Sequence, residues 1–289
     1  MSRNIAHSGT VEGVLATPPV GAPAVRDRSR REPGSLRLRP SRSAGDLVVA
    51  LVVIFVIWEI VARRYFADST SLAAPSAVFQ QMWADRELLW TNTRATVWVA
   101  ICGFVLGNAV AAIGATLFVL SPPVERVASR LALALYSLPT LILAPVLGMF
   151  LDAQATRVSV SALVVYFPTL VAMTAGLREP STSSLELIRS LGGTRLHALW
   201  LVRLRWSLPS LLAGMRVAVP GALLGAIGSE WLGADTGLGI FMVNALGYLN
   251  TDRVWACCLL CVVLTSAGYL VVGILHRLVN GWQLEVTGR

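Results

Sequence analysis

Long apolar runs, separated by shorter polar segments, fill the chain from residue 46 onward. A membrane core of about 30 Å requires about 20 predominantly apolar residues in helical form. Six runs approach or exceed this length: 46–62, 95–120, 127–151, 158–177, 208–232 and 254–276. The pattern therefore predicts an all-α integral membrane protein with six transmembrane helices.

Small residues and prolines recur within these runs. Gly103 and Gly107 have the G-x-x-x-G spacing that lets helix backbones approach closely in a membrane, and so do Gly221 and Gly225. The central runs also contain four prolines that are expected to kink or loosen their helices: Pro139, Pro145, Pro168 and Pro220. Kinked central helices suit a translocation pathway, and prolines tolerated without a function are the alternative interpretation.

A polar insert, from Arg178 to Ser207, separates the fourth apolar run from the fifth. Such a segment is long for a loop between membrane helices, so it calls for a structure of its own. Ser183 and Glu186 have the S-x-x-E spacing of a capping box, which predicts that a helix begins here.

The rest of the insert predicts a helix, a break and a second helix. Leu185, Ile188 and Leu191 form one apolar stripe at helical spacing. The glycine pair at 192–193 is expected to end this helix, and Thr194 to cap a second one. Because a short amphipathic helix is unstable alone in water, we expect it to dock onto its own chain or onto a partner.

Composition and charge support a membrane location. The 289 residues are 55% hydrophobic and 14% charged, whereas soluble domains contain about 25% charged residues. The net charge is +8, and all 24 basic residues are arginine. The arginines flank the apolar runs as the positive-inside rule describes. This distribution argues against nucleic acid as a partner. With both termini in the cytosol, 18 of the 24 arginines, including those of the insert, face inward.

Residues 1–45 differ from the rest of the chain. They are rich in Arg, Ser, Pro and Gly and cannot bury enough apolar surface to fold alone. We expect a disordered, basic cytosolic tail, with a transit peptide or a polybasic lipid contact as weaker alternatives. Residues 46–289 would then form the transmembrane domain.

Motifs for catalysis and for cofactor binding are absent from the sequence. It contains no GxxxxGK(S/T) loop for ATP, no H-E-x-x-H zinc motif and no G-x-S-x-G nucleophile motif. Its three histidines are dispersed, and its four cysteines lie in apolar runs, where they serve as small apolar side chains. We expect no enzyme activity, cofactor or metal in this chain, so energy for transport must come from a partner or a gradient.

Ionisable and polar residues within apolar runs are functional candidates. Glu59 stands four residues before Arg63 and is expected to pair with it. Glu230, near the end of the fifth run, is expected either to line a pathway or to pair with a neighbour such as Arg253. The residues most suited to face a pathway are Asn108, Tyr136, Ser137, Tyr166 and Glu230.

The insert also resembles a known motif. The spacing of Glu186, Gly192, Leu204, Leu208 and Pro209 resembles that of the EAA loop of ATP-binding-cassette (ABC) importer permeases. In that family, the loop is the coupling helix that sits in a groove of a separate ATPase subunit.

The insert departs from the family motif at three positions. Leu187 and Ile188 replace two alanines, and Arg205 replaces a proline. The resemblance implies a cytosolic coupling loop at 178–209. Its expected ATPase-coupling residues are Ser183, Leu185, Glu186, Leu187, Ile188, Leu191, Gly192, Gly193 and Pro209.

Four further segments extend the resemblance from about residue 70 to the end of the chain. Residues 75–79, 94–107, 138–150 and 232–256 are similar to permeases of the nitrate/sulfonate/taurine type. This resemblance implies a type I importer fold in a bacterial inner membrane and transport by alternating access. The implied partners are a second permease subunit, identical or different, two ATPase subunits that bind ATP and Mg²⁺, and an extracytoplasmic substrate-binding protein.

The resemblance implies a small polar, anionic solute, and sulfonate, nitrate, taurine and vitamin-precursor substrates all remain open. A gradient-driven secondary transporter is the first alternative, although Glu59 and Glu230 lie near span ends rather than at mid-membrane. A membrane scaffold or receptor without transport activity is the second.

Overall fold

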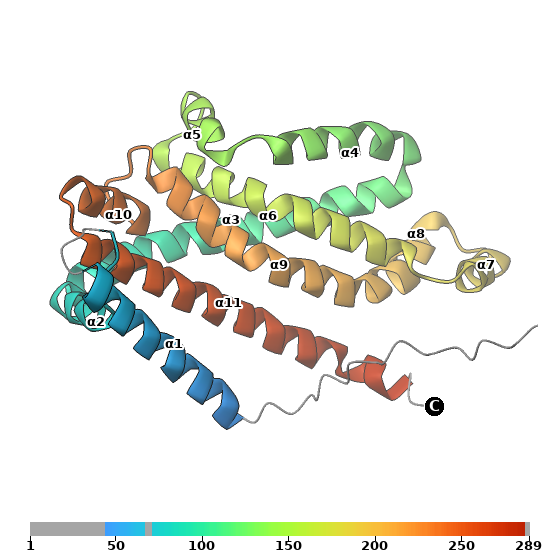
Figure 1. Ribbon diagram of the computed structural model, residues 1–289. Coiled ribbons are helices and arrows are strands. Elements are labelled where there is room, and N and C mark those ends of the chain that lie inside the picture. Colours follow the sequence, from blue (N-terminus) through green and yellow to red (C-terminus); the bar gives the residue numbers. More distant parts are fainter. Residues whose placement is uncertain (1–43, 67–70, 287–289) are drawn as a thin grey trace, which may run out of the picture. The chain divides into compact units, whose positions relative to one another are not determined.

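The computed structural model describes residues 44–66 and 71–286, and every secondary-structure element in these ranges is a helix (Figure 1). The tail predicted for residues 1–45 lies outside the described residues, apart from its last two. The chain divides into two compact units, and the boundary between them falls after Val49, inside helix α1 (Ala44–Tyr65). In the first unit, the described residues are 44–49, the start of this helix.

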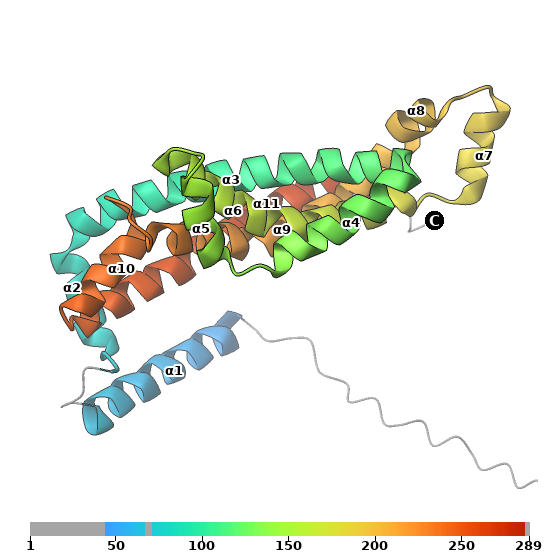
Figure 2. The same cartoon turned by 90° about the horizontal axis from the view of Figure 1, so that it is seen from above.

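In the second unit, the remainder of α1 is followed by α2 (Pro75–Ala84), α3 (Arg86–Leu120), α4 (Pro122–Ser137), α5 (Thr140–Gly148), α6 (Ala153–Arg178), α7 (Thr182–Ser190), α8 (Arg195–Ala198), the π-helix η1 (Leu199–Arg203), α9 (Leu204–Glu230), α10 (Leu238–Gly247) and α11 (Thr251–Val286). Helices α3, α6 and α9 pack against one another, and α11 lies along α9 (Figure 1). The short helices α7 and α10 lie at opposite ends of this bundle (Figures 1 and 2).

The long helices have the length and composition of membrane spans. Within the described ranges, four segments qualify: α3, α6, Arg195–Glu230 and Thr251–Val279. Helices α4 and α5 form a fifth if they count as one span, bent by 107° at the break between them. The predicted all-α class is confirmed, whereas the number of six spans stays a prediction.

The G-x-x-x-G positions lie where the central helices touch. A side chain at Gly103 of α3 would collide with Ser161 of α6, and a Cβ at Gly225 of α9 would lie 2.7 Å from the Ser161 Cα. The Ser161 hydroxyl is fully buried and donates a hydrogen bond of 2.9 Å to the Ala222 carbonyl oxygen. The prediction that these glycines allow close helix packing is confirmed.

The prolines differ in their effects on the helices. Pro139 stands at the N-terminus of α5, at the break where α4 ends. In contrast, Pro168 and Pro220 lie inside α6 and α9, which continue past them. Pro145 likewise lies inside α5. Pro139 thus stands at a bend between helices, whereas a kink or loosening at the other three prolines stays a prediction.

Candidate functional site

Helix α7 begins earlier than the capping-box pattern predicts. Its N-cap is Ser181, whose hydroxyl oxygen accepts a hydrogen bond of 3.3 Å from the Ser184 amide. The predicted capping box of Ser183 and Glu186 is therefore wrong. Residues 181–184 are all Ser or Thr, so each can cap a helix. In the structure the helix begins at Thr182, so Ser181 occupies the N-cap position.

The end of α7 follows the prediction. The helix stops at Ser190, and Gly192 has φ +77°, a left-handed conformation that favours glycine. A Cβ at Gly193 would lie 2.5 Å from Cγ2 of Ile188, so the turn packs tightly against the helix. Thr194 caps α8 in a capping box with His197, which confirms its predicted role.

The apolar side chains of α7 fall on two sides. Leu185 and Ile188 are half-buried, and Leu185 lines a pocket between α7 and the bundle. In contrast, the side chains of Leu187 and Leu191 are 60% and 76% exposed. The predicted single stripe is thus divided, since Leu191 follows the last helical residue and turns outward. Helix α7 has no fully buried residue, so its exposed leucines form an apolar surface without a partner in the described chain.

Two contacts fix the insert to the bundle. At its start, Arg178 forms an ion pair with Glu125 of α4. At its end, Nη1 of Arg203 donates a hydrogen bond of 2.9 Å to the carbonyl oxygen of Leu177, a fully buried residue of α6. The chain then continues through η1 into α9, where Pro209 lies half-buried in the first turns. These contacts tie the two ends of the insert to α4 and α6, and η1 continues it directly into α9.

Of the five predicted pathway residues, two are buried in helix contacts. The Asn108 amide oxygen of α3 accepts a hydrogen bond of 2.8 Å from the Thr169 hydroxyl of α6. Glu230 is fully buried and is described below.

The other three pathway candidates lie on or near α4. Tyr136 is 49% exposed and stacks on Phe167 at 4.5 Å between ring centroids. Ser137 is exposed, and its hydroxyl donates to the Ala134 carbonyl oxygen, whereas Tyr166 is half-buried in α6. A pathway role for these residues stays a prediction.

Glu230 belongs to a buried polar network at the end opposite α7. Its Oε2 accepts hydrogen bonds from the Thr96 hydroxyl at 3.0 Å and from the Gly239 amide at 2.8 Å. The Thr96 oxygen accepts a further bond, of 2.7 Å, from the Leu238 amide. Gly237, at φ +141°, faces the carboxylate so closely that a Cβ there would collide with it. The network therefore docks the start of α10 onto α3 and α9.

The expected pairing of Glu230 with Arg253 is not found. Arg253 instead forms two hydrogen bonds with Asp85, of 2.6 Å from Nε and 2.9 Å from Nη2. These bonds hold the pKa of the Asp85 carboxyl below its usual range, with a hydrogen bond from Gln81 acting in the same direction. The ion pair predicted between Glu59 and Arg63 is confirmed.

Sequence reasoning did not identify Thr96, Asp85 or the α10 amides as parts of these networks. The Thr96 and Glu230 side chains are 134 residues apart in sequence, and those of Asp85 and Arg253 are 168 apart. A polar residue on an apolar helix face was the one available signal, and it does not say which distant group is its partner.

Apolar helices with the length of membrane spans pack around a close-packed centre, and a short helix with exposed leucines lies at one end, an arrangement that fits a helical membrane protein with a surface for a partner. The sequence pattern of the family described as "Binding-protein-dependent transport system inner membrane component" matches residues 103–282. The chain belongs to this family, whose members are permease subunits of ABC importers and are not themselves enzymes.

Several relatives support this assignment. This chain is 31% identical to a protein of Haemophilus influenzae named "Probable ABC transporter permease protein". The match covers 78% of this chain and 94% of that protein. The formylaminopyrimidine transport permease protein ThiX of Halalkalibacterium halodurans is 26% identical, over 85% of this chain and 99% of its own. A solved amino acid ABC transporter has the same fold, with a TM-score of 0.57 and 19% identity over 69% of this chain and 97% of that one.

Proposed function

We propose that this permease imports a small polar, anionic solute by alternating access, driven by a separate ATPase that docks on α7. The observation that carries the proposal is the exposed pair Leu187 and Leu191 on a helix within an insert whose two ends are held to the bundle. An apolar surface on a rigid support suits a partner that must push on it. We infer import rather than export because the chain belongs to the family of importer permeases.

The names of the relatives support the solute class. They include permeases for aliphatic sulfonates and taurine in Escherichia coli and for nitrate in Leptolyngbya laminosa. Others are named for formylaminopyrimidine and riboflavin, so a vitamin precursor belongs to the same proposal. The solute would be delivered by an extracytoplasmic binding protein.

We place α7 and both chain termini in the cytosol of a bacterial cell, because this orientation puts most arginines inside. A second permease subunit would complete the pathway. Supporting this, α4 and α5 carry large apolar side chains that are exposed, including Leu131, Leu133 and Ile142. The permease domain would comprise residues 46–289.

Replacement of Leu187 by Glu tests the coupling role. Burial of a leucine stabilises an interface by about 1.5–3 kcal/mol, so ATPase affinity should fall about 10- to 100-fold. The chain would be tagged in its native membrane, and both the co-purified ATPase and its ATP hydrolysis would be measured. Leu88→Glu is the matched control, because Leu88 is 51% exposed and lies in the first turn of α3. This turn follows directly on α2, which lies at the end of the bundle opposite α7 (Figure 1).

Loss of the ATPase in Leu187→Glu but not in Leu88→Glu would support the proposal. Equal retention in both variants would contradict docking at α7. A chain that purifies without any ATPase, yet moves solute when a proton or sodium gradient is imposed, would instead establish the secondary transporter.

A further inference from the structure

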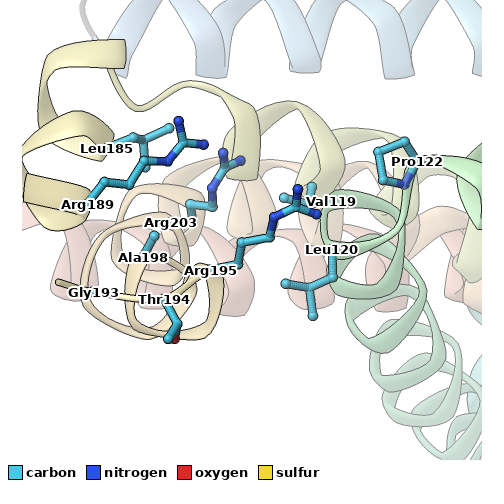
Figure 3. Close-up of a pocket in the computed structure, with 10 residues that line it drawn as sticks. All are labelled: Val119, Leu120, Pro122, Leu185, Arg189, Gly193, Thr194, Arg195, Ala198 and Arg203. Carbon is cyan, nitrogen blue, oxygen red and sulfur yellow. The ribbon is translucent and has the colours of Figure 1, made fainter.

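Three arginines line one pocket beside the coupling helix. The pocket has a volume of about 460 Å³, within the range of about 300–1,000 Å³ that is typical of small-molecule sites. Arg189 comes from α7, Arg195 from α8 and Arg203 from η1. Figure 3 shows their side chains in the space between these elements and Val119 and Leu120, at the end of α3.

The positive charge of this pocket is not balanced by the residues that form it. None of its lining residues is acidic, and none of the three arginines forms an ion pair within the described ranges. Arg189 and Arg178 both lie close enough to Arg203 for their positive charges to act on the Arg203 guanidinium. Like charges gathered in this way repel one another, so an anion between them would be favourable.

Guanidinium groups indicate which anion fits. Each presents a planar fork of N–H donors that matches the oxygens of a phosphate group, often with two hydrogen bonds at once. The Arg203 group uses one donor on the Leu177 carbonyl oxygen, which fixes its position and leaves its other donors available. No acceptor within the described residues holds the guanidinium of Arg189 or Arg195, so neither group has to give up a protein hydrogen bond before it binds phosphate.

The position of the pocket indicates where the phosphate comes from. Its walls are the last residues of one apolar span, which ends at Leu120, and the first residues of another, which begins at Arg195. Phospholipid headgroups lie at this level of a membrane, and basic pockets between membrane helices bind them. Trp200, which is 69% exposed, lies five residues beyond Arg195, and tryptophan is enriched at the same level.

We propose that this pocket binds the phosphate of an anionic phospholipid headgroup. The apolar walls formed by Val119, Leu120 and Leu185 accommodate the glycerol end of the lipid. Because the three arginines come from three elements, one headgroup links α7 to α8 and to η1, beside the end of α3. The lipid thereby holds the coupling helix in place. This inference does not depend on ATPase docking, since its test uses the permease chain alone.

The test compares lipids added to the purified full-length chain in a mild, uncharged detergent. Phosphatidylglycerol, phosphatidylcholine and inorganic phosphate are titrated separately, and the apparent Tm and the bound lipid, by native mass spectrometry, are recorded. The test variant is Arg189→Gln/Arg195→Gln. The matched control is Arg126→Gln/Arg205→Gln, which removes two exposed arginines outside the pocket.

Phosphatidylglycerol should bind and stabilise the wild type and the control alike, whereas phosphatidylcholine should not. The test variant should need at least about tenfold more phosphatidylglycerol, because each lost charge-assisted hydrogen bond contributes on the order of a tenfold change in affinity. If that variant does not purify as a single species, Arg189→Lys/Arg195→Lys replaces it. Its response should fall between those of the wild type and of lipid-free protein, since lysine keeps the charge and loses the fork.

Three results would overturn the proposal. The first is an equal response of the pocket variant and the wild type. The second is equal stabilisation by phosphatidylcholine, which would show a general lipid effect. The third is equal stabilisation by inorganic phosphate at the same concentration, which would assign the pocket to a free anion and not to a lipid.

Discussion

The buried carboxylate of Glu230 gives the sharpest prediction about the fold. Glu230→Ala removes the oxygen that accepts hydrogen bonds from Thr96 and Gly239. The Thr96 hydroxyl keeps another acceptor, the Asn92 carbonyl oxygen at 3.2 Å. The Gly239 amide has no other acceptor within the described residues, so the cost of the change falls mainly on this one donor.

The magnitude follows from that donor. A buried N–H group left without a partner costs about 1–3 kcal/mol. In a chain of this size, such a loss lowers the apparent Tm by roughly 2–12 °C. Glu230→Gln keeps an acceptor oxygen and places its amide nitrogen where Oε1 has no partner within the described chain, so we expect less than half the loss.

The assay measures thermal unfolding of the full-length chain in detergent, together with protease cleavage in the segment 232–252. Faster cleavage in Glu230→Ala would show that α10 has separated from α3 and α9. An alanine variant with the Tm and the protease resistance of the wild type would refute the docking role. A glutamine variant as unstable as the alanine variant would show that the charge, rather than the acceptor, is required.

Two further predictions concern packing and pH. Gly103→Ala should lower the Tm, because the added Cβ meets Ser161, whereas Gly228→Ala, with open space around it, should leave the Tm unchanged or raise it. Asp85→Asn should cost about 1.5–3 kcal/mol near neutral pH by weakening the bonds from Arg253, as measured by unfolding in detergent. Since the pKa of Asp85 is lower in the folded chain, its contribution is present above the unfolded pKa of about 3.9 and lost as pH falls through the folded pKa. The Tm difference between wild type and Asp85→Asn should therefore shrink progressively as pH falls below about 4, and a difference that stays constant as the carboxyl is protonated would contradict the pairing.

Local patterns in the sequence determined the helices and several of their ends. The apolar runs predicted the long helices, and the glycine pair at 192–193 predicted the end of α7. The cap at Thr194 and the ion pair of Glu59 with Arg63 were also predicted correctly. In the cap and in the ion pair the interacting groups are three and four residues apart, so the helix geometry alone brings them together.

Only the tertiary structure decided how distant groups combine. Asn108 meets Thr169, and Arg253 meets Asp85 rather than Glu230, because the helices are packed at particular rotations that no local pattern specifies. Four hydroxyl residues stand at the start of α7, and the structure shows that Ser181 is the one that caps it. The arginines of the pocket were visible in the sequence as scattered charges of an insert. Their convergence required α7, α8 and η1 to fold back beside α3, since a shared site depends on the packing of elements and not on the spacing of residues along the chain.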